Sequence, residues 1–187
     1  VPRSTADNAQ DVTDIGLKYS NGPLNVAYAT QKISQTGTLA TAANSFIATG
    51  SQALAAGKSN KLSILSANYT IGAATVYGAT WTEKQDTSTA VDTSGRMIGA
   101  KYVMGAHTFM VQTGSAKLNS SGQTSTATYQ VEGQKSTLTG IGYDYALSKR
   151  TALYARIDSR DANKNSSTDD ATNGTTKRTA IGLRHTF

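Results

Sequence analysis

The chain has 187 residues, a formal net charge of +6 and no cysteine, which excludes a disulfide framework and thiolate chemistry. Its lysines and arginines are mostly scattered singly, so the positive charge forms no patch that would favour nucleic acid as a partner. The mean hydropathy is −0.37, and no run approaches the roughly 18 apolar residues of a membrane-spanning helix. The first residues are polar, so we expect that a signal peptide has been removed or lies outside this sequence.

Segments of alternating hydrophobicity, typical of strands with two different surroundings, follow one another along the chain. Their length suits a tilted strand that crosses a bilayer, which needs about 9–11 residues. The nine predicted strands are residues 12–19, 24–31, 61–69, 73–82, 96–103, 107–115, 136–145, 151–160 and 178–187.

The connections between these strands alternate between short and long. The short ones are residues 20–23, 70–72, 104–106 and 146–150, and three of them hold the Gly or Asn that tight hairpins need. The long ones are residues 32–60, 83–95, 116–135 and 161–177, which are rich in Ser, Thr, Asn, Asp and Gly. Short turns on one rim and long loops on the other are typical of an outer-membrane barrel, whereas a soluble β-sandwich or meander has no reason to keep this asymmetry.

An alanine-rich stretch, residues 39–56, lies within the longest loop. Its composition would allow a turn or two of helix, but folded-back loop structure is the favoured expectation.

Charged residues recur on one side of the alternating strands. A charge facing lipid costs about 2–4 kcal/mol near the midplane, whereas in a water-filled lumen it stays solvated. The alternative is that the charged side of these strands is the solvated face of a soluble sheet. We predict that the pore is lined by the cations Lys18, Lys101, Arg156, Arg160 and Arg184 and by the anions Asp14, Asp144 and Asp158. Five cations against three anions predict a slight preference for anions.

Aromatic residues provide a second clue to the surroundings of the strands. Four tyrosines end strands next to short turns, as an interfacial girdle would require: Tyr19, Tyr69, Tyr102 and Tyr145. The segment 73–82 is ambiguous, and we expect Tyr77 and Trp81 to face outward. Tyr154 is then the only clear aromatic residue of the lumen.

The sequence offers no catalytic constellation. His107 and His185 have no zinc-type spacing, and no nucleophile elbow, P-loop or dinucleotide fingerprint occurs. His185 lies on the apolar side of its strand, and we expect it to be an interface residue at the periplasmic rim. We therefore predict no enzyme, no metal site and no cofactor.

Two segments carry a resemblance to a known family. Residues 147–157 (LSKRTALYARI) and 180–187 (AIGLRHTF) resemble the closing strands of trimeric general-diffusion porins of the proteobacterial outer membrane, of the beta-proteobacterial and neisserial type. The resemblance implies a 16-stranded homotrimeric barrel, surrounded by lipid and lipopolysaccharide, for passive diffusion of small hydrophilic solutes and ions. It also implies that Phe187 is part of an assembly signal recognised by the barrel-assembly machinery.

The expected fold is thus all-β, an antiparallel transmembrane barrel. If the C-terminus is periplasmic, the first of the nine strands also descends, and an odd number of strands must precede it. Seven would complete sixteen, so residues 1–187 are expected to be the C-terminal part of one barrel domain, strands 8 to 16.

Two rival functions remain, a substrate-specific channel and a structural or adhesive barrel whose loops bind a partner. The second would need apolar anchors, present here as Ile33, Leu39, Phe46, Ile47 and Leu54.

Overall fold

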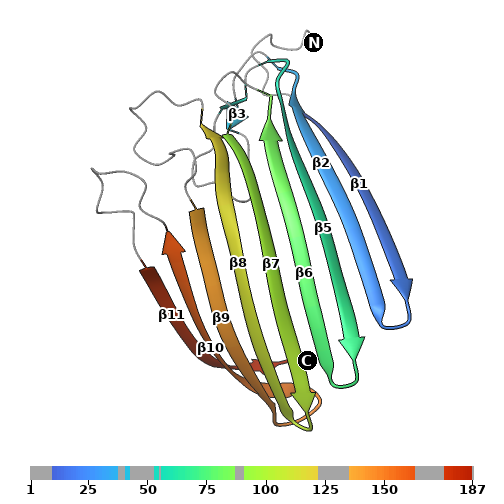
Figure 1. Cartoon of the computed structure of the whole chain (residues 1–187), viewed down its shortest axis with the longest axis vertical. Coiled ribbons are helices and arrows are strands. Elements are labelled where there is room, and N and C mark those ends of the chain that lie inside the picture. The colour runs from blue at the N-terminus through green and yellow to red at the C-terminus, as the bar shows by residue number, and fades with distance from the viewer. Residues whose placement is uncertain are drawn as a thin grey trace.

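The computed structural model describes residues 10–37, 41–42, 53–54, 56–86, 91–121, 135–162 and 175–186. Nine long strands make one sheet in which every strand is antiparallel to its neighbours in the chain (Figure 1). These strands are β1 (Gln10–Asn21), β2 (Leu24–Gln35), β5 (Ser59–Ile71), β6 (Ala74–Gln85), β7 (Val91–Met104), β8 (His107–Ser121), β9 (Lys135–Ala146), β10 (Thr151–Ala162) and β11 (Thr175–His185).

All nine predicted strands are confirmed, and most extend further toward the long loops than the alternation indicated. For example, β2 continues to Gln35, β6 continues to Gln85 and β7 begins at Val91. Ladder hydrogen bonds need only a backbone, so pairing continues where the side chains no longer alternate. Inside the alanine-rich stretch, β3 (Thr41–Ala42) and β4 (Ala53–Leu54) pair with each other, in agreement with folded-back structure. The rest of that stretch lies outside the described residues.

Three of the short connections are two-residue hairpin turns built on glycine. Gly22, Gly72 and Gly105 have φ values of 54°, 57° and 58°, and no other residue type in the described part has a positive φ. Positive φ at the first central position alone is the pattern of a type II′ turn, which matches the twist of paired strands. These turns gather at one end of the sheet (Figure 1), as the short connections predicted.

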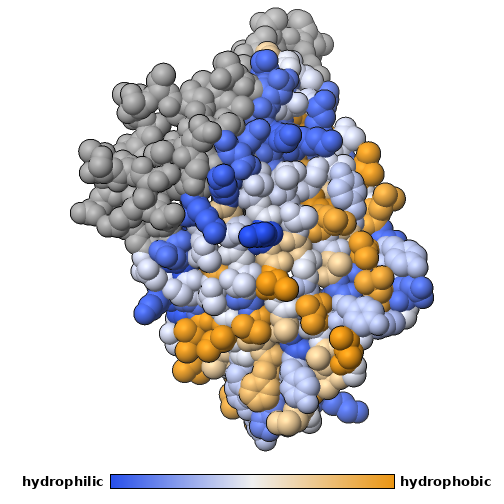
Figure 2. Space-filling model, viewed as in Figure 1, coloured by the Kyte–Doolittle hydropathy of each residue, from blue (hydrophilic) through white to orange (hydrophobic). Residues whose placement is uncertain are grey.

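The sheet is a single layer, so its apolar side chains are not covered by a second element. Many large apolar residues are exposed, and most of them lie on the same face, including Leu17 (67 %), Ile98 (57 %), Ile141 (56 %) and Ile181 (81 %). On the side that Figure 2 shows, hydrophobic residues gather toward the short turns and hydrophilic residues toward the long loops. The described part contains no helix that is long and apolar enough to cross a membrane.

Candidate pore-lining face

The strand register places all eight predicted lumen residues on one face of the sheet, which we call the charged face. Directly opposed residues of a ladder share a face. Arg156 is opposed to Gly142, Asp158 to Gly140 and Asp144 to Tyr154, and the same pairing runs through every strand. The charged face therefore carries Asp14, Lys18, Lys101, Asp144, Arg156, Asp158, Arg160 and Arg184.

The charged face is the concave face. One hollow on it is lined by residues from β6 to β10, and a second by residues from β6 to β11. Side chains of five or six successive strands can border one hollow only where the sheet curls toward them. The opposite, convex face, which we call the apolar face, carries most of the exposed aliphatic side chains.

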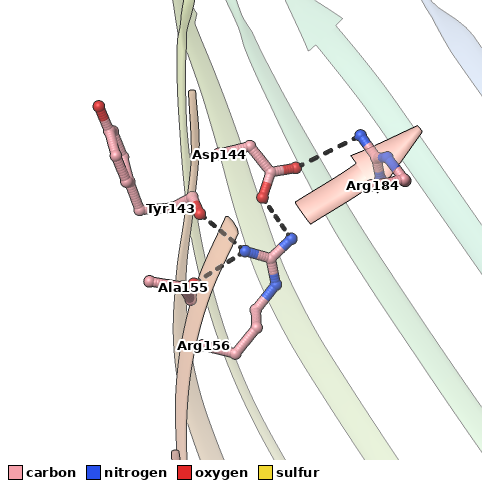
Figure 3. Close-up of polar contacts among 5 residues, drawn as sticks. All are labelled: Tyr143, Asp144, Ala155, Arg156 and Arg184. Carbon is pink, nitrogen blue, oxygen red and sulfur yellow. Dashed lines mark hydrogen bonds and ion pairs between the residues drawn. The ribbon is translucent and has the colours of Figure 1, made fainter. Parts of the chain in front are cut away.

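Asp144, two residues before the end of β9, contacts two arginines (Figure 3). Arg156 Nη2 lies 2.6 Å from Asp144 Oδ1, and Arg184 Nη2 lies 3.7 Å from Asp144 Oδ2. Arg156 Nη1 also donates to the carbonyl oxygens of Tyr143 and Ala155, at 2.9 and 2.8 Å. The carboxylate is 14 % exposed and the Arg156 side chain 34 %, so this pair is better shielded than a surface ion pair. The Arg184 side chain is 67 % exposed.

Farther toward the long loops, the same face carries two more arginines. Arg178 Nε donates to Asp158 Oδ1 at 2.8 Å, and Arg160 Nε donates to Ser136 Oγ at 3.0 Å. Arg178 was missing from the predicted lining, although its parity in the last strand is the same as that of Arg184 and would have found it.

Tyr77 and Trp81 lie on the charged face, so the expectation that they face outward is wrong. Tyr77 is opposed to Gly99, and Trp81 to Gly95, in the ladder of β6 with β7. The alternation misled because the other side of β6 carries mainly small or hydroxyl-bearing residues, so the bulkier aromatics looked like the lipid side. Tyr154 is therefore not the only aromatic residue of this face.

Glycines on neighbouring strands leave room for large side chains to reach across the charged face. A Cβ built on Gly95 would overlap the indole ring of Trp81. A Cβ on Gly142 would lie 3.0 Å from Arg156 Cδ, and one on Gly182 would lie 2.6 Å from the Tyr154 hydroxyl. Absence of a side chain at these positions keeps the aromatic and guanidinium groups against the wall.

A buried polar cluster that the sequence analysis missed lies at the loop end of the charged face. Glu83 is 2 % exposed; its carboxylate accepts from Asn60 Nδ2 at 2.8 Å and from Thr93 Oγ1 at 3.4 Å. Glu83 and Thr93 fell within a predicted loop and Asn60 ended another, so none was assigned to a face.

The four tyrosines expected in a girdle all lie on the apolar face, next to the short turns. They are joined there by His107, whose Nδ1 lies 2.7 Å from the Tyr143 hydroxyl and whose ring packs near Tyr145. His185 is also on this face, and its Nδ1 lies 2.9 Å from Thr151 Oγ1. Phe187, the predicted assembly signal, lies outside the described residues.

An antiparallel meander with a charged concave face, an apolar convex face and short turns at one end defines part of an outer-membrane β-barrel. A family model described as Gram-negative porin matches residues 2–166. The chain therefore belongs to the Gram-negative porin family, which places it in the bacterial outer membrane. No curated protein matches the chain by sequence.

Solved structures of outer-membrane proteins share the fold. OmpT of Vibrio cholerae in its trimer form is 16 % identical, with a TM-score of 0.66 over 99 % of this chain and 58 % of that one. A loop-deletion mutant of the same protein gives 16 % identity and a TM-score of 0.67, covering 99 % of this chain and 56 % of the other. An anion-selective porin from Comamonas acidovorans is 20 % identical, with a TM-score of 0.64 over 92 % of this chain and 48 % of that one. The chain thus spans about half the length of these structures.

Proposed function

We propose that this chain forms part of the wall of a water-filled channel through which small hydrophilic solutes and ions diffuse passively across the outer membrane. The observation that carries the proposal is the division of one sheet into a charged concave face and an apolar convex face. Charges in a hydrated lumen keep their solvation, while the aliphatic residues of the other face suit lipid. Both histidines lie on the apolar face, so the proposal assigns them no catalytic role, and it requires no cofactor.

The channel would prefer anions slightly. The charged face carries the five predicted cations together with Arg178, against the three predicted anions together with Glu83. A pore wall with excess positive charge raises the local concentration of anions. One structurally similar porin is described as anion-selective, which supports the same direction for this chain.

The test of this function is a charge reversal on the charged face of the full-length protein in planar bilayers. The variant combines Lys101→Glu, Arg156→Glu and Arg184→Glu. We expect the reversal potential in a KCl gradient to shift toward cations, most strongly at low salt, because the Debye length grows from about 10 Å at 0.1 M to about 30 Å at 0.01 M. The control carries Lys61→Glu, Lys84→Glu and Lys117→Glu on the apolar face, and should shift much less. Equal shifts in the two variants would contradict the assignment of the faces.

We also propose that the nine strands are strands 8 to 16 of a barrel that closes with further strands and assembles as a homotrimer. β1 and β11 are the two ends of the described sheet order, and a sheet edge with unpaired backbone groups is costly in lipid. The solved structures are about twice as long as this chain, and one of them is a trimer form. In this arrangement Phe187 would serve recognition by the barrel-assembly machinery rather than conduction.

Lipopolysaccharide is the proposed lipid partner at the loop end of the apolar face. Lys32 is opposed to Lys61, and Lys61 to Lys84, so three lysines stand in one row across β2, β5 and β6. Lys117 and Lys135 are likewise opposed across β8 and β9. Like charges directly opposite each other destabilise a sheet, and these exposed lysines form no ion pair with a described carboxylate. Phosphate groups of the outer leaflet would neutralise them.

The lipid proposal predicts a specific loss of affinity for lipopolysaccharide. Lys32→Gln, Lys61→Gln and Lys84→Gln together should weaken binding of lipopolysaccharide to the full-length protein about tenfold, because phosphate contacts are lost. A control with Lys18→Gln, Lys101→Gln and Lys149→Gln removes the same charge elsewhere and should change the affinity little. Dephosphorylated lipopolysaccharide should bind both variants alike. A preserved difference with the dephosphorylated lipid would show that the lysines do not act on phosphate.

A further inference from the structure

The charged face holds an apolar slot that ends in arginine. One row of directly opposed residues runs from Met97 on β7 through Gly114 on β8 and Leu138 on β9 to Arg160 on β10. All four residues border the same hollow, together with Trp81 and Arg178. Hydrated ions need no apolar side chains in the wall of a channel. The apolar row therefore indicates a contact with the apolar part of a ligand.

Met97 and Leu138 form the two sides of the slot. Met97 and Leu138 stand on strands two apart, which puts their backbones about 9.6 Å from each other. Gly114 lies between them and has no side chain, so the floor of the slot is backbone. Met97 is 38 % exposed although it is apolar, and the indole of Trp81 lies over Gly95 on the adjacent row. A planar apolar group can lie on Gly114 between these walls and remove them from water.

Two arginines at one end of the slot are each held in place by a hydrogen bond. Arg160 is held through Nε by Ser136, and Arg178 through Nε by Asp158. These are the only hydrogen bonds that either side chain forms among the described residues, and Arg160 forms no ion pair with a described carboxylate. Among the described residues, the two Nη groups of Arg160 therefore have no partner, and such groups can bind a carboxylate through two parallel hydrogen bonds.

We propose that this slot is a binding site for small organic anions that join a carboxylate to a flat apolar body, such as an arylalkanoate. The site rests on the proposed function, since it requires the charged face to be open to diffusing solutes, and it names a solute class that the channel would favour. Binding would use two contacts at once, the ring over Gly114 between Met97 and Leu138, and the carboxylate on Arg160. Inorganic anions use only the second contact, and neutral aromatics only the first.

The experiment measures how three probes change the KCl current of the full-length protein in planar bilayers. The probes are 3-phenylpropionate, propionate, which lacks the ring, and 2-phenylethylammonium, which reverses the charge. We expect 3-phenylpropionate to reduce the current at concentrations at least about tenfold lower than either control probe, because only it makes both contacts. Equal potency of propionate would show attraction by charge alone and would overturn the site.

Substitutions at Arg160 and Lys177 test whether the block by 3-phenylpropionate arises in the slot. Arg160→Gln should raise the half-blocking concentration of 3-phenylpropionate about tenfold, and Arg160→Lys should raise it nearly as much because the bidentate geometry is lost. Lys177→Gln removes a neighbouring charge from the apolar face and should leave the block unchanged. Heat-modifiable migration on gels establishes that each variant is folded. Unchanged block in both folded Arg160 variants would refute the proposal.

A second readout separates this inference from the channel itself. Trp81 is the single tryptophan of these 187 residues, so the difference in fluorescence between the protein and its Trp81→Phe variant reports the slot. The difference should saturate with 3-phenylpropionate and not with propionate. A protein that carries no KCl current would refute the proposed function, while saturation would still support the slot. A conducting protein without saturation would refute the slot alone.

Discussion

At the scale of single residues, the charged face pairs large side chains with glycines. Trp81 lies over Gly95, Arg156 over Gly142 and Tyr154 over Gly182. Each large group is thereby kept close to the sheet, and the guanidinium of Arg156 also lies 5.5 Å from the Tyr154 ring centroid. Glycine in a strand interior weakens the strand, and here its cost is offset by the position it gives to its neighbour.

Asp144 is the residue whose loss should be felt most clearly on this face. Asp144→Asn removes the charge that Arg156 contacts at 2.6 Å, while Arg156 keeps its hydrogen bonds to two carbonyl oxygens. We expect the free energy of unfolding to fall by about 1–2 kcal/mol, since the pair is partly shielded from water. Anion preference should rise, because a negative charge leaves the wall.

Urea unfolding of the full-length protein in lipid vesicles measures this loss of stability, and the reversal potential in a KCl gradient measures the selectivity. Asp14→Asn is the matched control, because Asp14 is exposed and forms no ion pair among the described residues. It should change selectivity in the same direction with little loss of stability. Equal destabilisation by the two substitutions would contradict a special role for the Asp144 pair.

Much of this detail could be predicted from parity alone. The eight expected lumen residues share a face because a strand has a period of two and their strands alternate clearly. The same rule failed for Tyr77 and Trp81. The other side of β6 carries mainly small or hydroxyl-bearing residues, so the side with the two aromatic residues looked like the one that faces lipid. The hydrogen-bonded cluster around Glu83 could not be predicted, because it depends on residues from three strands and on how far the ladders extend.

At the scale of elements, the hairpins at the turn end depend on glycines in the left-handed region. Gly72 has a φ of 57°, and a Cβ there would meet no atom within 4 Å, so any penalty is conformational rather than steric crowding by neighbours. The strand ends, in contrast, were harder to predict, because pairing runs past the last alternating residue into sequences rich in Ser, Thr and Gln.

Gly72→Ala should therefore lower the free energy of unfolding by about 1 kcal/mol, because an L-residue is disfavoured at positive φ. Gly72→Asn should cost less, since asparagine is, with glycine and aspartate, one of the residues that dominate turns of this kind. Gly16→Ala is the control, as Gly16 also meets no atom within 4 Å but has no positive φ. Urea unfolding of the three full-length variants measures these differences in the free energy of unfolding. Similar losses for Ala and Asn at position 72 would argue against the conformational account.

At the scale of the whole molecule, arginine and lysine are distributed unevenly between the two faces of the sheet. The charged face carries four arginines, Arg156, Arg160, Arg178 and Arg184, whereas the opposed lysine rows lie on the apolar face at the loop end. Planar guanidinium groups suit directed contacts with passing carboxylates, and flexible ammonium groups suit a mobile layer of lipid phosphates. The sheet would in this way meet solutes on one side and lipid on the other.

The central claim is that the charged face borders water inside a conducting channel, and adjacent residues of β7 test it directly. Lys101 lies on the charged face and Tyr102 on the apolar face. The 187 residues contain no cysteine, so Lys101→Cys or Tyr102→Cys introduces a single thiol into them. Each full-length variant is reconstituted in a planar bilayer and exposed to an anionic methanethiosulfonate reagent during current recording. The account predicts rapid modification that lowers the current at position 101 and leaves it unchanged at position 102. Loss of current at position 102 with none at position 101 would contradict it.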